Sequence, residues 1–280
     1  MHRYFAHGLI VDSEIVLPGA LPLPGRPAGT APITIRTGPA DAPEKARHLG
    51  PYSYTADCIH IAEPDVAQVL CRTGGEITVH PAAGSDEMTI GSHLIATALP
   101  AQLWWRGDVV LHAAGVVLPG HVTVTAVAGP SGAGKSEVAA QCLASGAELV
   151  GDDTLRLWRG PRGWRVAGLP GGYFHRSPDG TRQFIELRGQ QPAPARPLGR
   201  ILALALPRGA APCLSPLTGT EALSTLLANR HRPRLPELMG LEAKQRSTLT
   251  ALSAYLPVTR WDRAEGQTEL HPEERSMLFG

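Results

Sequence analysis

The feature that most constrains this chain is a glycine-rich loop between an apolar run and a short helical pattern. The residues GPSGAGKS, from Gly129 to Ser136, fit the pattern GxxxxGK[ST] without a mismatch. The apolar run HVTVTAVAG leads into the loop, and SEVAAQCLASG follows it, closed by Gly146. These flanks predict a strand before the loop and a helix after it. A strand–loop–helix unit of this kind indicates an α/β fold.

The loop is suited to holding phosphate groups. Its glycines allow backbone N–H groups to turn toward phosphate oxygens, and the helix N-terminus adds a partial positive charge. Lys135 is expected to neutralise the terminal phosphates of a nucleotide, and the Ser136 hydroxyl to bind Mg²⁺. Only three of the 26 Lys and Arg residues are lysines, so a lysine at the fixed position of this pattern, Lys135, is a specific signal. The residues expected to contact the nucleotide are Gly129, Pro130, Ser131, Gly132, Ala133, Gly134, Lys135, Ser136 and Glu137.

Two adjacent acids follow the helical pattern. Asp152 and Asp153 come directly after AELVG (147–151), which predicts the next strand. Ligands of α/β proteins bind at the carboxyl ends of strands, so the pair is expected near the loop. Neighbouring carboxylates repel each other, and a Mg²⁺ ion or a shared proton relieves that repulsion. A solvated acidic turn is the structural alternative. Likewise, His112 in VVLHAAGVVL would by itself be an ordinary core histidine of an apolar strand.

The first hundred residues are predicted to form a mostly β domain. GLIVDSEIVL, PITIRTG, CIHIAE and GEITVH are rich in β-branched residues and are separated by Pro and Gly. Residues 92–105 have helical apolar spacing, in which Pro100 is expected to kink or split the helix. Residues 18–32 are expected to be a loop or extended linker. We therefore expect one domain over 1–100 and a second over 101–280.

From residue 106 onward the pattern predicts an α/β core. Pro119-Gly120 is expected to join two strands, 108–118 and 121–129, in a tight hairpin. RILALALP (200–207) predicts a buried strand. TEALSTLLANR and LMGLEAKQRSTLTALSAYL predict helices.

Bulk composition excludes several classes of protein. A net charge of +1 over 280 residues gives no whole-chain attraction for nucleic acid or a membrane surface. The four cysteines are scattered without a CxxC pair, so buried reduced thiols are expected. The sequence shows no signal peptide and no apolar run of about 18 residues. We expect a cytoplasmic protein with no nucleic-acid or membrane partner.

Together, these residues resemble the HPr kinase/phosphorylase family. The series LHAAGVVLPG, VTAVAGPSGAGKSEVAA and GAELVGDDTLRL, within residues 106–157, is similar to the catalytic domain of that family. It is most similar to the HPr-kinase-like peptide serine kinases of lasso-peptide (ribosomal peptide) biosynthesis. The N-terminal region of this chain, YFAHGLIVDSEIVLP, also resembles that group. The matching positions are His112, Gly129, Ser131, Gly132, Gly134, Lys135, Ser136, Asp152 and Asp153.

The resemblance implies a P-loop core of the HPr-kinase/PEP-carboxykinase type behind a smaller N-terminal domain. It implies ATP- and Mg²⁺-dependent transfer of the γ-phosphoryl group to a Ser hydroxyl of a peptide or protein. One aspartate would act as base and the other would help to hold the metal. We assign the base to Asp152 and metal support to Asp153 with Ser136, although the two aspartates could be exchanged. His112 and Lys135 would lie close to the phosphates, so His112 is also a candidate catalytic residue.

Two family features have only loose counterparts. Glu186 and Arg188 in FIELRGQQ partly match an E-I-R-G signature, and NRHRPR (229–234) is the nearest candidate for a late basic loop with a catalytic Arg. Phosphorylase activity is therefore not carried over. The open alternatives are an HPr-type protein kinase/phosphorylase, phosphoryl transfer to a small molecule as in PEP carboxykinases, and a non-catalytic nucleotide sensor. The parent family forms hexamers, so a homo-oligomer stays open.

Overall fold

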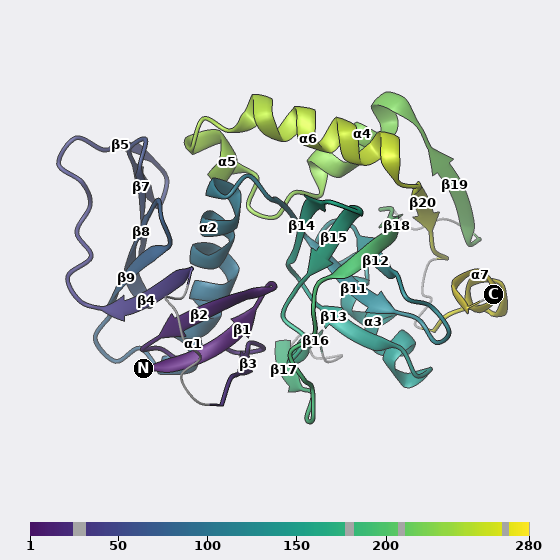
Figure 1. Ribbon diagram of the computed structural model, residues 1–280, viewed down its shortest axis with the longest axis horizontal. Helices are drawn as coiled ribbons and strands as arrows, with labels where there is room; N and C mark the ends of the chain where they lie inside the picture. Colours follow the sequence, from purple (N-terminus) through teal and green to yellow (C-terminus); the bar gives the residue numbers. More distant parts are fainter. Residues whose placement is uncertain (25–31, 177–181, 207–210, 265–268, 280) are drawn as a thin grey trace. The chain divides into compact units, whose positions relative to one another are not determined.

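The computed structural model describes residues 1–24, 32–176, 182–206, 211–264 and 269–279, which form a mixed α/β protein (Figure 1). By their contacts they form two compact units. The first unit comprises Met1–Asp108 with Arg232–Gln245, and the second comprises Val109–His231 with Arg246–Gly280. This division differs from the predicted boundary at residue 100, because the first unit extends to Asp108 and the chain returns to it at Arg232, where α5 packs on α2.

The strands are β1 (His2–Ala6), β2 (Leu9–Ser13), β3 (Leu21–Pro22), β4 (Ile33–Thr37), β5 (Arg47–Leu49), β6 (Tyr52–Tyr54), β7 (Cys58–Glu63), β8 (Ala67–Arg72), β9 (Glu76–Pro81), β10 (Val109–Leu111), β11 (Ala113–Val117), β12 (Val124–Ala128), β13 (Glu148–Gly151), β14 (Leu155–Gly160), β15 (Gly163–Ala167), β16 (Gly172–Arg176), β17 (Arg182–Glu186), β18 (Arg196–Leu204), β19 (Cys213–Leu217) and β20 (Val258–Asp262). The helices are α1 (Glu87–His93), the π-helix η1 (Leu94–Ala98), α2 (Leu99–Trp105), α3 (Lys135–Ala144), α4 (Gly219–Ala228), α5 (Arg234–Leu238), α6 (Glu242–Tyr255) and α7 (Pro272–Phe279).

The first unit is built on a nine-stranded sheet in the order β3-β1-β2-β4-β9-β8-β7-β6-β5. The strands predicted in the first hundred residues are confirmed as β2, β4, β7 and β9. Alternate residues along the strands of this sheet point to one face, whose fully buried side chains include Val11, Ile35, Ile59, Val69 of β8 and Val79. The linker predicted over 18–32 contains the short strand β3, and its residues 25–31 lie outside the described residues.

A π-helical turn interrupts the predicted helix over 92–105. Pro100 lies in the first turn of α2, where it lacks the N–H that would bond the carbonyl of Ala96. The Nε of Arg232 donates to this carbonyl at 3.1 Å. Pro100 thus splits the helix as predicted, and a side chain from the returning segment bonds the carbonyl that Pro100 itself cannot bond.

The second unit has a mixed sheet in the order β10-β14-β15-β18-β12-β11-β13, which β20 and β19 extend beside β18. β12, β18 and β20 are parallel, and the other pairs are antiparallel. Apolar side chains cover both faces. Ala126 and Ile201 pack with residues of α4 and α6, whereas Val127 and Leu202 pack with α3. Each fully buried Val, Leu or Ile side chain of these clusters contributes roughly 1.5–3 kcal/mol.

The strand predicted over 108–118 is two strands. β10 pairs with β14, whereas β11 pairs with β12 and β13. His112 lies at the break, so it is not an interior residue of a continuous strand as predicted. The hairpin through Pro119-Gly120 is confirmed, with Gly120 in the left-handed region at φ +78°.

Three cysteines are buried free thiols as expected, whereas Cys213 is exposed. Burial raises the pKa of Cys71 to about 12 and that of Cys142 to about 11. Within the described part of the chain, every helix is too short or too polar to cross a membrane.

Candidate functional site

Three neighbouring strands bring the predicted site residues to one edge of a sheet. β11 lies between β12 and β13 and runs antiparallel to both. The ends of β12 and β13 therefore lie beside the start of β11. Gly129 follows β12, Asp152 follows β13, and His112 precedes β11. Strand order alone thus places the loop, the acids and the histidine together.

The Gly129–Ser136 loop leads directly into α3. Gly132 and Gly134 have left-handed φ values of +81° and +97°, and Gly134 is the N-cap of α3. A Cβ added at Gly132 would meet nothing within 4 Å, so backbone conformation, not crowding, requires glycine there. The first N–H groups of α3 have no partners within the helix, which makes this loop an anion-binding arrangement.

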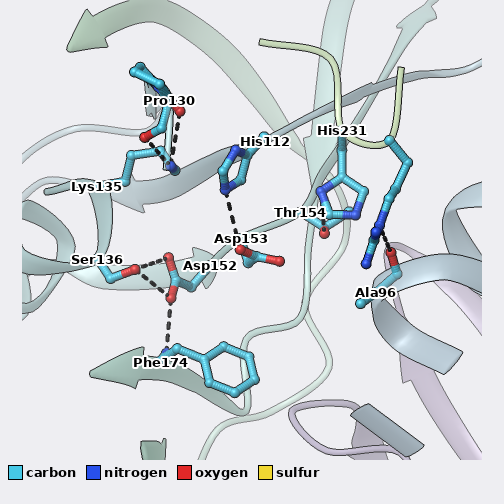
Figure 2. Close-up of polar contacts among 12 residues, drawn as sticks. Ala96, His112, Pro130, Lys135, Ser136, Asp152, Asp153, Thr154, Phe174 and His231 are labelled. Atoms are coloured by element: carbon cyan, nitrogen blue, oxygen red, sulfur yellow. Dashed lines mark hydrogen bonds and ion pairs between the residues drawn. The ribbon is translucent and has the colours of Figure 1, made fainter. Parts of the chain in front are cut away.

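Lys135 folds back over the loop to which it belongs. Its side chain is buried, and Nζ donates to the carbonyls of Gly129 at 2.9 Å and Pro130 at 3.1 Å (Figure 2). Of the other predicted loop contacts, Ser131 and Glu137 are exposed. The side chain of Ala133 packs into the core, so only its backbone can contact a ligand.

The carboxylate of Asp152 is buried and held from two sides. The Ser136 hydroxyl lies 3.0 Å from both of its oxygens, and the Phe174 N–H donates to Oδ2 at 2.9 Å (Figure 2). Burial raises the pKa of Asp152 above its ordinary value, and repulsion by Asp153 adds to the rise. The bonds from Phe174 and Ser136 act in the opposite direction.

The carboxylate of Asp153 has a different environment. Its Oδ1 lies 3.4 Å from Nε2 of His112, and both side chains are about one quarter exposed, at 27% and 26%. This pair can therefore reach a ligand, whereas Asp152 is closed off by its partners. The two adjacent aspartates are chemically distinct.

A tight turn separates these two environments. Asp153 has φ +68°, and the Thr154 N–H donates to the carbonyl of Asp152 at 2.8 Å. A bond from residue i+2 to residue i around a left-handed residue is the signature of the rare, strained γ-turn. Backbone strain of this kind costs roughly 1–3 kcal/mol. The turn directs Asp152 to Ser136 and Asp153 to His112.

Close backbone packing supports the start of that turn. A Cβ added at Gly151 would lie 2.7 Å from Cα of Gly168, and one added at Gly168 would lie 2.8 Å from Cα of Gly151. Real side chains do not tolerate such contacts, so both positions require glycine. The backbone before Asp152 is therefore held in place by its neighbour.

Sequence reasoning missed Phe174 and His231. Phe174 is on the β16–β17 hairpin and fixes Asp152 through its backbone N–H, which no side-chain pattern reveals. His231 lies within the basic run 229–234 and approaches Thr154, with Nδ1 3.4 Å from Oγ1 (Figure 2). The available signal was a histidine within a run that is otherwise rich in arginine.

The loosely matched family signature lies on the same hairpin. Glu186 ends β17 and Arg188 follows it, and both side chains are exposed. The hairpin reaches the acid pair through β16, because Phe174 is the residue that bonds Asp152.

The oxygen donors at this site fit a hard divalent cation. The described residues contain no group of three or more His, Cys, Asp or Glu side chains placed to hold a metal ion. Mg²⁺ in phosphoryl transfer normally takes one or two protein oxygens and completes its shell with water and phosphate. Ser136 and Asp152, whose oxygens lie 3.0 Å apart, are such a donor pair.

No protein-family model matches the chain. No curated protein matches it either. Among solved structures, the chain is similar to the Hpr(Ser) kinase/phosphatase from Coxiella burnetii, with a TM-score of 0.33 and 12% sequence identity over 60% of this chain and 90% of that chain. A likeness of this size carries no argument about fold or function.

Proposed function

We propose that the protein is an ATP- and Mg²⁺-dependent kinase that transfers the γ-phosphoryl group to a serine hydroxyl of a peptide or protein. The observation behind this proposal is that the two aspartates have different surroundings. Asp152 is buried against Ser136 of the loop, whereas Asp153 is accessible and faces His112. A protein that only binds a nucleotide needs no more than the loop. A second, accessible carboxylate beside the loop is suited to accept a proton from an acceptor hydroxyl.

The loop residues fit the phosphates of ATP. The helix N-terminus and the left-handed glycines offer N–H groups, and Lys135 supplies a buried positive charge beside them. Ser136 and Asp152 would hold Mg²⁺, which when bound neutralises charge on the phosphates. This assigns metal support to Asp152, the reverse of the assignment made from the sequence.

Asp153 is the proposed base. Its carboxylate accepts the proton of the serine hydroxyl while the serine oxygen bonds to the γ-phosphorus and the bond from that phosphorus to the bridging oxygen of ADP breaks. His112 lies 3.4 Å from Oδ1 of Asp153 and orients the carboxylate. Asp152 is less suited, because the Ser136 hydroxyl and the Phe174 N–H already occupy its oxygens.

The acceptor is proposed from the resemblance of the N-terminal region, YFAHGLIVDSEIVLP, to the HPr-kinase-like peptide serine kinases. That resemblance supports a ribosomally synthesised precursor peptide of the lasso type over the HPr protein. Nothing in the charge of the chain favours a nucleic acid, since the net charge is +1.

Incubation with γ-labelled ATP, Mg²⁺ and three acceptor sets tests the proposal: lasso-type precursor peptides, HPr, and small hydroxyl metabolites. We expect label on a peptide serine, located by fragment mass spectrometry, and loss of labelling in Asp153→Asn with nucleotide binding retained. Label on HPr alone would reassign the acceptor, and label on a metabolite alone would make the protein a small-molecule kinase. Nucleotide binding without transfer to any set would make it a sensor.

A further inference from the structure

We infer that His231 is a positioning residue that holds the imidazole of His112 against Asp153. The catalytic consequence of this inference rests on the proposed function, whereas the structural relationship does not. His231 belongs to the segment Asn229–His231, which follows α4. His231 itself lies 77 residues after Thr154 in the sequence.

The backbone of His112 is fixed by the segment Asn229–His231. The His112 N–H donates to the carbonyl of Asn229 at 2.8 Å, and the His231 N–H donates to the carbonyl of Val110 at 2.8 Å. Between these two bonds, Leu111 and Arg230 form an antiparallel bridge. His112 lies at the break between β10 and β11, where the regular strand pairing changes. The segment therefore supplies the pairing that the strand lacks at this point.

The segment is itself anchored. Asn229 is the C-cap of α4, is buried, and its Nδ2 donates to the carbonyl of Thr225 at 2.8 Å. Arg230 donates through Nε to the carbonyl of Leu227 at 3.2 Å. The same two carbonyls also accept the backbone N–H groups of Asn229 and Arg230, so side chain and backbone are both tied to the end of α4. The position of His231 is thus set by the helix end, not by a free loop.

The ring of His231 contacts both the ring of His112 and Thr154, the residue that follows the proposed base Asp153. It packs edge-on against the ring of His112, with centroids 6.0 Å apart and planes at 69°. Its Nδ1 lies 3.4 Å from Oγ1 of Thr154, the residue after Asp153. At that distance the hydrogen bond is weak, so the edge-to-face contact is the main restraint. His231 is buried and His112 is about one quarter exposed, so the inner ring limits the rotation of the outer one.

Three consecutive residues therefore meet three partners from distant parts of the chain. Asp152 contacts Ser136, Asp153 contacts His112, and Thr154 contacts His231 (Figure 2). The contact of Asp152 with Ser136 forms the proposed Mg²⁺ site. The other two contacts position Asp153, the proposed base, and its partner His112. Loss of His231 should therefore impair the transfer step and leave ATP binding intact.

Nuclear magnetic resonance of histidine side chains tests the inference without any activity. In protein labelled with ¹⁵N at its 11 histidines, long-range ¹H–¹⁵N spectra report the ring environment of each, and the signals lost in His112→Gln identify His112. We expect His231→Ala to shift or broaden the His112 ring signals and His231→Phe, which keeps an aromatic edge, to leave them closer to wild type. His121→Ala, which removes an exposed histidine of the same unit, is the matched control and should leave them unchanged.

Kinetics give the second measurement. We expect His231→Ala to lower kcat roughly ten- to hundredfold with little change in KM for ATP, and His231→Phe to recover part of the loss. Unchanged His112 signals in His231→Ala overturn the inference whatever the kinetics show. Shifted signals in a protein that transfers no phosphate to any acceptor support the inference and overturn the proposed function. Should His231→Ala fail to fold, His231→Leu decides, because leucine fills the space without an aromatic edge and wild-type His112 signals in that variant overturn the inference.

Discussion

The Ser136 hydroxyl lies 3.0 Å from both carboxylate oxygens of Asp152. This contact joins the start of α3 to the end of β13 and leaves the next residue, Asp153, to face His112. Two neighbouring acids of the same type thereby acquire different surroundings, and the proposed function gives them different tasks. Environment, not residue identity, decides which carboxylate is closed by hydrogen bonds and which is partly exposed.

Replacing each aspartate by asparagine separates the two tasks. We expect Asp153→Asn to reduce phosphoryl transfer by about 10²–10⁴-fold, the usual contribution of a general base, with ATP affinity unchanged. Asp152→Asn should instead raise the Mg²⁺ concentration needed for half-maximal ATP binding. Calorimetric titration of ATP over a Mg²⁺ series, beside a transfer assay, makes the distinction. Loss of transfer with a normal Mg²⁺ requirement in Asp152→Asn, together with a raised Mg²⁺ requirement in Asp153→Asn, would restore the assignment made from the sequence.

Asp152 should make the stability of the ligand-free protein depend on pH. Its pKa is raised in the folded state, chiefly by burial, so the folded protein binds the proton more tightly than the unfolded chain does. The free energy of unfolding therefore falls as pH rises from the ordinary value of 3.8 through the raised pKa. We expect Asp152→Asn to raise Tm at neutral pH and to lose this advantage as the solution is acidified through that window.

Thermal unfolding of both proteins from about pH 4 to 8, without Mg²⁺ or nucleotide, measures this effect. The control is Asp41→Asn, since Asp41 is an exposed acid, and it should leave the Tm profile parallel to wild type. A Tm difference between Asp152→Asn and wild type that does not change with pH would show that burial of this carboxylate is not the cause.

Lys135→Ala should remove most of the ATP affinity. The ammonium group lies on the carbonyls of Gly129 and Pro130, where it is placed to meet phosphate oxygens. We expect the Kd for ATP to rise roughly 100-fold, because a charge-assisted contact in a buried site is worth about 2–3 kcal/mol. Lys45→Ala removes the same charge from an exposed position and should bind ATP as wild type does. Equal affinity of both variants would exclude Lys135 as a phosphate ligand.

Gly151→Ala should destabilise the protein and disturb the acid pair together. The new methyl group would lie 2.7 Å from Cα of Gly168, so one backbone must move, at a cost of about 1–3 kcal/mol. Gly38→Ala is a suitable control, because its methyl group would make only an ordinary 3.5 Å contact with Thr78. Denaturant unfolding compares the two, and equal free energies of unfolding would show that the contact at Gly151 is relieved without cost.

Local features of this protein could be predicted because their causes are local. The spacing of glycines in the Gly129–Ser136 loop, the apolar runs around it and the turn at Pro119-Gly120 depend on neighbouring residues, and the corresponding elements are present. The effect of Pro100 was also predictable, since a missing N–H breaks a helical bond in any context. The placement of the acid pair after a strand belongs to the same class.

Other features depend on which strands become neighbours. His112 was expected inside one strand, but β10 and β11 choose different partners and leave it at their junction. Residues 232–245 belong to the first unit because α5 packs on α2, although more than a hundred residues separate the two helices in the sequence. Strand partners and helix docking are set by the sum of many weak apolar contacts, which no single segment encodes.

The sequence by itself determined that this chain has a glycine loop opening a helix, with two acids one strand later, because glycine conformation and apolar periodicity act within a few residues. Only the tertiary structure decided that Asp152 closes on Ser136 while Asp153 turns to His112, with His231 beside it. The γ-turn at Asp153 and the pairing of residues 110–112 with 229–231 set those directions. Both depend on contacts between segments far apart in the chain, whose geometry exists only once the sheet has formed.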